Sequence, residues 1–226
     1  LDDNARIDFH NNYTAQIHGH AHPRINAAVE HQLPRGTAYS APGAQEYELA
    51  KLLCERIGSI EQVVFNNSGT EAVMVALRCA RAHTGRNKIG LFEGAYHGNH
   101  EYVSVTVNTP LSKLDPSGLT AIPEWPGQPP SVVEDVIVLP YNDLDRSESI
   151  LREHASELAC LIMEPVASNF GYVPAEEEFL RGIRELTTEL GVVLVFDEVQ
   201  SFRLSPGGAQ EYLGVTPDVT TFGKII

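Results

Sequence analysis

The stretch VVLVFDE, from Val192 to Glu198, constrains the fold of this chain more than any other. Every position before Asp197 is apolar, which is typical of a strand that is buried on both faces. Strands of this kind lie inside parallel sheets whose two faces are covered by helices. The stretch therefore predicts an α/β fold with a mainly parallel sheet.

The rest of the chain agrees with this interpretation, because helical and strand-like patterns alternate from residue 44 onward. The periodicity predicts helices at 44–58, 70–85 and 175–191, and strands at 61–65, 87–93, 133–143, 157–165 and 192–198. Such alternation implies right-handed crossover connections between parallel strands. The segment 112–131 is predicted to be a long loop, and loops of that length in compact domains are usually functional or mobile.

Charge and cysteine usage narrow the class of protein. Lysine and arginine total 16 against 30 aspartate and glutamate residues, a formal net charge of −14. We therefore expect no nucleic-acid partner and no anionic membrane partner. No apolar run approaches the roughly 18 residues that a membrane span needs. Cys54, Cys79 and Cys160 stand in apolar periodic segments, and we expect buried free thiols in a cytoplasmic protein.

Parallel sheets bind ligands in the loops beyond the carboxyl ends of their strands, and four short stretches fall there. The first is NNSGTEA, between a predicted strand and a predicted helix. Ser68, Gly69 and Thr70 offer hydroxyls and backbone N–H groups at a helix N-terminus, which suits a phosphate. The lysine of a nucleoside-triphosphate loop is missing. The alternative is that Ser68 only caps the helix.

The second stretch is FEGAYHG, from Phe92 to Gly98, directly after a predicted strand. Tyr96 can stack its ring on a flat heteroaromatic ligand, and His97 can act as an acid or a base. The alternative is a turn whose aromatic side chain packs on the core.

The third stretch is VFDEVQ. An acid at the end of a doubly buried strand is costly without a partner, so Asp197 is a candidate to hold a proton on a ring nitrogen. Because side chains alternate along a strand, Glu198 is expected to point away, and Val199 to return to the side of Asp197. The alternative is a turn-forming Asp-Glu pair.

The fourth stretch, TTFGKII, closes the chain. Lys224 follows an extended run and Gly223, so it also lies at a strand end. A lysine that is shielded from water has a lowered pKa and can form Schiff bases as a neutral nucleophile. The alternative is an ordinary surface lysine. An apolar ending and a start at Leu1 without methionine indicate a piece of a longer protein.

One competing constellation is HGHAHP, where His18, His20 and His22 alternate and would share one face of a strand, as metal ligands do. No nearby carboxylate or cysteine is available in the sequence to complete a site. We therefore expect no metal.

Together, the four stretches resemble the class III aminotransferases of pyridoxal-phosphate fold type I. In that family a Ser-Gly-Thr-Glu-Ala phosphate loop, a Tyr before His-Gly, an Asp-Glu-Val and a Schiff-base lysine occur in this order. Here they are Ser68–Thr70, Tyr96, Asp197–Val199 and Lys224. The segments GHAHP, PRGTAYSAP, VLPYND and EPV match as well, so the resemblance covers nearly the whole chain.

The resemblance implies a three-layer α/β/α sandwich. It implies an N-terminal segment at 1–43, a large domain at 44–226 that is incomplete at its C-terminal end, and a small domain outside this chain. It also implies a homodimer whose active site takes a partner residue from beyond Lys224.

The resemblance further implies pyridoxal 5'-phosphate as the cofactor. The implied roles are a covalent bond from Lys224, a contact of Asp197 with the ring nitrogen, ring-face contacts of Tyr96 and Val199, phosphate contacts of Ser68, Gly69 and Thr70, and a contact of Asn169 on the ring-hydroxyl side. The implied catalytic residues are Lys224 and Asp197.

The implied reaction depends on the branch of the family. GGAQEYLGVTPDVTTFGKII and FEGAYHG resemble glutamate-1-semialdehyde 2,1-aminomutase, an isomerase of tetrapyrrole precursor synthesis. DEVQSFRLSP is one residue shorter than the aminomutase pattern and is nearer the β-amino-acid aminotransferases. We therefore predict amino transfer between an amino acid or amine and a keto acid, with the aminomutase as the alternative. An inactive homologue that binds the cofactor is a third option, against which the intact Lys224 and Asp197 argue.

Overall fold

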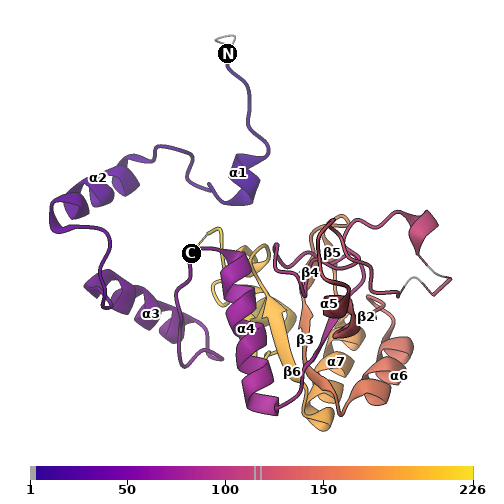
Figure 1. Cartoon of the computed structure of the whole chain (residues 1–226). Coiled ribbons are helices and arrows are strands. Elements are labelled where there is room, and N and C mark those ends of the chain that lie inside the picture. Colours follow the sequence, from indigo (N-terminus) through magenta and orange to yellow (C-terminus); the bar gives the residue numbers. More distant parts are fainter. Residues whose placement is uncertain (1–3, 115, 118, 226) are drawn as a thin grey trace.

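A five-stranded sheet forms the centre of the computed structural model, which describes residues 4–114, 116–117 and 119–225 (Figure 1). The strands are β1 (Lys88–Phe92), β2 (Val136–Leu139), β3 (Leu158–Met163), β6 (Val193–Asp197) and β7 (Val219–Thr221). Their order is β2-β1-β3-β6-β7, and every pairing between them is parallel. The predicted parallel sheet is therefore confirmed.

Helices cover both faces of this sheet. Helix α4 (Gly69–Thr84) packs on one face, and α6 (Leu144–His154) and α7 (Glu177–Leu190) pack on the other. Alternate side chains of one strand enter the two cores: Ile162 lies in the α4 core, whereas Leu161 and Met163 lie in the core under α6 and α7. This alternation confirms the three-layer α/β/α sandwich.

Helices α4 and α7 are bounded by capping residues that can be recognised in the sequence. The Ser68 hydroxyl accepts a hydrogen bond from the Glu71 backbone N–H at the start of α4, at 3.2 Å. Gly85 after α4 and Gly191 after α7 adopt the left-handed conformation that closes a helix. Both helices were predicted with these ends.

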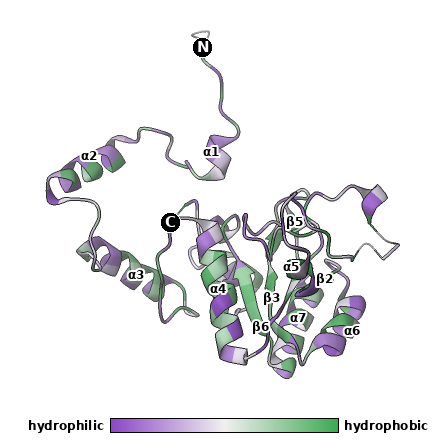
Figure 2. Cartoon of the chain, viewed as in Figure 1, coloured by the Kyte–Doolittle hydropathy of each residue, from purple (hydrophilic) through white to green (hydrophobic). Residues whose placement is uncertain are grey.

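The remaining elements are short or lie outside the sandwich. They are α1 (Asn11–Thr14), α2 (Pro23–Gln32), α3 (Ala44–Arg56), α5 (Pro130–Glu134), α8 (Gly208–Leu213), the antiparallel pair β4 (Val166–Ala167) and β5 (Val173–Pro174), and 3-10 turns at Leu33–Arg35, Leu111–Lys113 and Phe202–Leu204. Helices α1, α2 and α3 form an N-terminal arm beside the sandwich. The strands are mostly apolar, whereas the arm helices mix apolar and polar residues (Figure 2). The predicted loop at 112–131 contains, among its described residues, only turns, one isolated bridge and the start of α5.

The prediction of a strand at 61–65 was wrong. The structure gives these residues no strand, and the Val64 side chain is 69% exposed. A strand forms only where a neighbour takes its backbone hydrogen bonds. Here a groove of about 690 Å³ separates the segment from β7, and residues 59–69 and 217–224 supply most of its lining. The segment has the composition of a strand but no pairing partner among the described residues.

The prediction for the cysteines was correct in part. All three are free thiols, but only Cys160, on a central strand, is buried. Cys54, on α3, is partly exposed. Cys79 is exposed because the side of α4 that carries it borders the groove rather than the sheet. No helix in the described part of the chain is long and apolar enough to cross a membrane.

Candidate active site

The candidate residues come from elements that meet at one edge of the sheet. Strands β1, β3, β6 and β7 are neighbours and parallel, so their carboxyl ends lie together. Asp197 ends β6, Glu164 follows β3, the Tyr96 loop follows β1, and Lys224 follows β7. The sheet therefore brings together residues that are far apart in the sequence.

Asp197 is a buried side chain at this edge with several hydrogen-bond partners. It is 4% exposed, and its Oδ2 lies 2.8 Å from His97 Nδ1. Its Oδ1 accepts hydrogen bonds from the Val199 backbone N–H at 3.1 Å and from the Thr221 hydroxyl at 3.2 Å. Three partners from three segments thus compensate the burial of this carboxylate.

His97 is the partner that the sequence did not reveal. Its side chain is buried, with a residue exposure of 1%, and its Nε2 has no hydrogen-bond partner in the described part of the protein. The ring therefore faces Asp197 with one nitrogen and leaves the other unpaired.

Glu198 points to the other side of the sheet, as the strand alternation predicted. Its carboxylate accepts hydrogen bonds from the backbone N–H groups of Ala209 and Gln210 and, at 2.8 Å, from the Gln210 side chain. Burial raises the pKa of Glu198, and these hydrogen bonds oppose that effect. This carboxylate fastens β6 to α8 and does not face Asp197.

The start of α4 combines a helix cap with a close loop contact. Besides the Ser68 cap, the Thr70 hydroxyl accepts a hydrogen bond from the Asn99 backbone N–H at 3.1 Å. Gly98 has a φ of +93°, and a Cβ there would lie 2.5 Å from Thr70 Oγ1. The loop after Tyr96 thus approaches the helix N-terminus more closely than a residue with a side chain would allow.

Val199 lies between two glycines of the candidate site. A Cβ built on Gly69 would be 3.3 Å from Val199 Cγ2, and one built on Gly223 would be 3.2 Å from Val199 Cγ1. The valine side chain therefore adjoins both the α4 N-terminus and the residue before Lys224.

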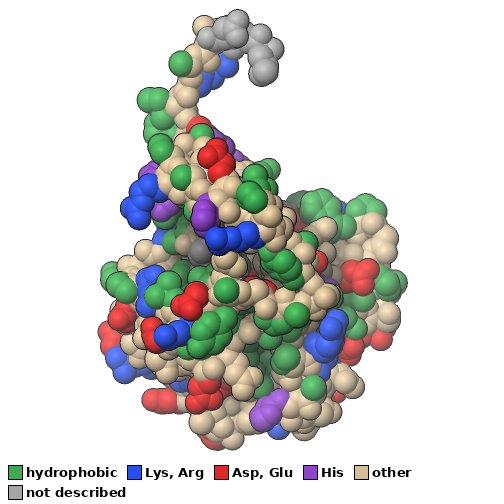
Figure 3. Space-filling model, turned by 90° about the vertical axis from the view of Figure 1, so that its left-hand side faces the viewer, with side chains coloured by type: hydrophobic (Ala, Val, Ile, Leu, Met, Phe, Trp, Pro, Cys, Tyr) green, Lys and Arg blue, Asp and Glu red, His purple; other side chains and the backbone are tan. Residues whose placement is uncertain are grey.

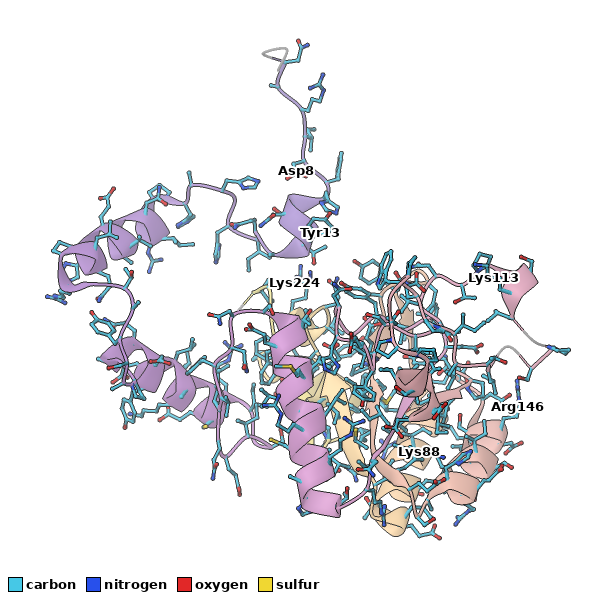
Figure 4. The ribbon with its side chains drawn as sticks, viewed as in Figure 1. Asp8, Tyr13, Lys88, Lys113, Arg146 and Lys224 are labelled. Atoms are coloured by element: carbon cyan, nitrogen blue, oxygen red, sulfur yellow. The ribbon has the colours of Figure 1, made fainter. Side chains whose placement is uncertain are left out.

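Lys224 is partly buried and has a φ of +65°, which is uncommon for a residue with a side chain. Its Nζ donates a hydrogen bond to the Tyr13 carbonyl oxygen of the N-terminal arm at 2.7 Å (Figure 4). Burial lowers the pKa of Lys224, and the positive charge of Arg203 lowers it further, whereas Asp197 opposes the shift.

Tyr96 and Asn169 lie on two loops that contact each other. The Tyr96 side chain is 51% exposed, and its backbone N–H donates to Glu164 Oε2 at 3.2 Å. Asn169 Nδ2 donates to the Gly94 carbonyl at 3.1 Å and also contacts acceptors of Val107 and Asn108. Asn169 thus braces the Tyr96 loop, and its direct cofactor contact stays a prediction.

The three alternating histidines lie on a turn of the arm instead of a strand. The expectation that no carboxylate lies near these histidines was wrong, because Asp8 Oδ2 lies 3.6 Å from His20 Nε2, and both side chains are exposed. Over the described residues, no group of three or more His, Cys, Asp and Glu side chains is arranged to hold a metal ion.

This chain is similar to known proteins in sequence and in structure. The sequence pattern of the class-III aminotransferases matches residues 1–226. The chain is 44% identical over 227 residues to the glutamate-1-semialdehyde 2,1-aminomutase of Natranaerobius thermophilus, covering 100% of this chain and 51% of that protein. It therefore spans about half the length of this curated relative.

Three solved structures are also similar. An omega-transaminase from Sphaerobacter thermophilus has a TM-score of 0.93 and 48% identity over 97% of this chain and 50% of that one. A transaminase with PLP bound has a TM-score of 0.89 and 43% identity, over 97% of this chain and 50% of that one. A β-phenylalanine aminotransferase from Variovorax paradoxus has a TM-score of 0.80 and 38% identity, over 96% and 46% of the two chains.

Proposed function

Because this chain belongs to the class-III aminotransferase family, whose enzymes depend on pyridoxal phosphate, we propose that the full-length protein transfers an amino group between an amino acid or amine and a keto acid. The observation that carries this proposal is the buried Asp197 carboxylate, which His97, Val199 and Thr221 fix at the same sheet edge as Lys224. Such an acid beside a lysine of lowered pKa is what a pyridine ring with an aldehyde requires.

The side chains at this edge fit pyridoxal phosphate chemically. The N-terminus of α4 offers backbone N–H groups and the hydroxyls of Ser68 and Thr70 to a phosphate. Gly69 and Gly98 keep that place open, since side chains there would meet Val199 and Thr70. We propose that Ser68, Gly69 and Thr70 hold the phosphate, that Tyr96 and Val199 contact the two ring faces, and that Asn169 contacts the ring-hydroxyl side.

Lys224 and Asp197 would carry the chemistry. When bound, pyridoxal phosphate supplies an electron sink for the electrons of a broken substrate bond. Lys224 would bind the cofactor covalently through Nζ, and its lowered pKa leaves more of the amine neutral and able to accept a proton. Asp197 would hold a proton on the ring nitrogen, and His97 would keep the carboxylate in place.

We infer net transamination rather than migration of the amino group within one molecule. The segment DEVQSFRLSP begins at Asp197 and is one residue shorter than the aminomutase pattern, and it is closer to the β-amino-acid aminotransferases. Similarity to an omega-transaminase and a β-phenylalanine aminotransferase supports the same choice. The second candidate is glutamate-1-semialdehyde 2,1-aminomutase, which the identity to the Natranaerobius enzyme favours.

One assay distinguishes the two candidates. Full-length protein is given β-amino acids with a keto-acid acceptor in one reaction and glutamate-1-semialdehyde alone in another. We expect a new amino acid in the first and no rapid formation of 5-aminolevulinate in the second; the opposite pattern would establish the aminomutase.

Asp197→Asn should lose about 10²–10³-fold in turnover, as expected when a charge-stabilising contact is removed. Near-normal turnover in this variant would remove Asp197 from the mechanism.

We further propose that the full-length protein is a homodimer in the cytoplasm, with 1–43 as an N-terminal segment and 44–226 as part of the large domain. In support, Ile25, Val29 and Leu33 recur at helical spacing on the arm and are exposed. On the face shown in Figure 3, apolar side chains are exposed among charged and histidine side chains. Light scattering should give twice the mass of the chain, and a monomer at micromolar concentration would contradict the dimer.

A further inference from the structure

Glu164 is a buried acid at the candidate site to which the mechanism above assigns no role. It directly follows β3, which lies between β1 and β6, so it stands between the loop of Tyr96 and His97 and the end of β6 at Asp197. Its side chain is 3% exposed. A carboxylate this deeply buried is retained only where it has partners.

The partners of Glu164 belong to two different loops. Its Oε2 accepts a hydrogen bond from the Tyr96 backbone N–H at 3.2 Å. Its Oε1 accepts one from the Ser168 hydroxyl at 2.5 Å and one from the Ser168 backbone N–H at 3.3 Å. One carboxylate therefore ties the Tyr96 loop to the turn that carries Asn169. The hydrogen bond from Asn169 to the Gly94 carbonyl joins the same two loops a second time.

The charges around Glu164 are those of the candidate site. Burial raises its pKa, His97 and the Ser168 hydroxyl oppose this, and the Asp197 carboxylate adds to it. Glu198 provides a useful contrast, because it is also buried but its partners lie on α8. Both acids fasten two segments together: Glu164 joins two loops that each carry a proposed cofactor contact, whereas Glu198 joins the end of β6 to α8, which carries none.

We propose that Glu164 is a positioning residue for the cofactor: it holds Tyr96 and the Ser168–Asn169 turn in fixed relation at the ring. This inference rests on the proposed function, since it assigns Tyr96 and Asn169 to the cofactor. Glu164 acts through these residues and contacts no reacting atom.

The test compares Glu164→Gln with Glu198→Gln in the full-length protein. Glutamine keeps the side-chain volume, but one of the two accepting oxygens becomes an NH₂ group. That group is a donor and cannot accept the hydrogen bond from Tyr96 or Ser168 that it now faces. Hydrogen exchange in the cofactor-free protein reports the Tyr96 N–H directly. Dissociation constants and visible circular dichroism with pyridoxal phosphate report the positioning of the ring.

We expect Glu164→Gln to speed exchange at Tyr96 beyond any change elsewhere in the chain. We also expect it to weaken cofactor binding about five- to tenfold, the worth of one lost hydrogen bond of roughly 1 kcal/mol, and to change the visible dichroism. Glu198→Gln should speed exchange at Ala209 and Gln210 and change the dichroism less than Glu164→Gln does. Ser168→Ala, which removes a single donor, should act as Glu164→Gln does but less strongly, and it serves if Glu164→Gln fails to fold.

Two results would overturn the inference, and they have different meanings. If Glu164→Gln or Ser168→Ala matches Glu198→Gln in cofactor affinity and dichroism, Glu164 is only a structural acid. If the wild-type protein binds no pyridoxal phosphate, the proposed function fails and the positioning role fails with it. Exchange at Tyr96 would then show only whether the hydrogen bond exists in solution.

Discussion

His97 Nδ1 lies 2.8 Å from Asp197 Oδ2, and both side chains are buried. His97 lies in the loop after β1 and Asp197 is the last residue of β6, and β3 separates these two strands in the sheet. The histidine therefore reaches across the central strand to fix the carboxylate. This relationship links the aromatic loop to the acid that we propose for the ring nitrogen.

Replacing His97 should impair turnover without unfolding the protein. His97→Phe keeps a ring of similar bulk but removes the donor, and a hydrogen bond to a charged group contributes about 1.5–3 kcal/mol. We expect a fall in kcat of about 10- to 100-fold, with the cofactor still bound. His97→Gln, which keeps a donor, should recover part of the activity. Equal kcat values for His97→Phe and the wild type would show that His97 has no positioning role.

The strand alternation at Asp197 was readable from the sequence, but its partner was not. The apolar run before Asp197 predicted a buried strand and placed Glu198 on the opposite side, and the structure confirms both. The pairing with His97 depends on which strands neighbour each other, a property of the tertiary fold that no local pattern encodes. The same holds for Thr221, which approaches Asp197 from β7.

Two errors in the predicted elements have local causes. Helix α6 was not predicted, although Asp143 caps it and Leu144 and Leu151 recur at helical spacing, so the signal was present. The segment 61–65 was predicted as a strand on composition alone. Composition favours a strand but cannot supply the neighbouring backbone that a strand requires.

Lys224 should be the residue that carries the cofactor. We expect full-length protein with pyridoxal phosphate to be yellow, and borohydride to bleach the band and fix the mass of the cofactor on Lys224. Lys224→Ala should still bind the cofactor through phosphate and ring contacts but transfer no amino group. Lys88, which is paired with Glu157 at 2.9 Å, is the matched control: Lys88→Ala should label normally. Label on Lys88 or Lys113 in the wild type would refute the assignment.

The reaction of Lys224 with the cofactor aldehyde should depend on pH in a predictable direction. Burial and the Arg203 charge lower the pKa of Lys224, so at any given pH more of this amine is neutral than for a surface lysine. In the cofactor-free protein, the rate of incorporation should rise with pH and level off below the pH at which surface lysines do. Arg203→Gln should move this profile to higher pH. A profile that follows the usual lysine range, unmoved by Arg203→Gln, would contradict the lowered pKa.

Gly98 should tolerate no side chain, for two separable reasons. Its φ of +93° disfavours a residue with a Cβ, and that Cβ would lie 2.5 Å from Thr70 Oγ1 and 3.0 Å from Thr70 Cα. Gly127 has a similar φ of +99° but no heavy atom within 4 Å of the added Cβ, so Gly127→Ala measures the backbone strain alone. That strain should cost about 1–2 kcal/mol in the free energy of unfolding.

Gly98→Ala should cost more than Gly127→Ala in a urea titration, because the loop must also move away from the helix. If Thr70 belongs to a phosphate site, that movement will weaken cofactor binding in Gly98→Ala and leave it unchanged in Gly127→Ala. Equal cofactor affinities in the two variants would mean that the contact between Gly98 and Thr70 maintains the fold alone. A larger loss in Gly98→Ala would connect the close approach of this loop to the phosphate site that we propose at the N-terminus of α4.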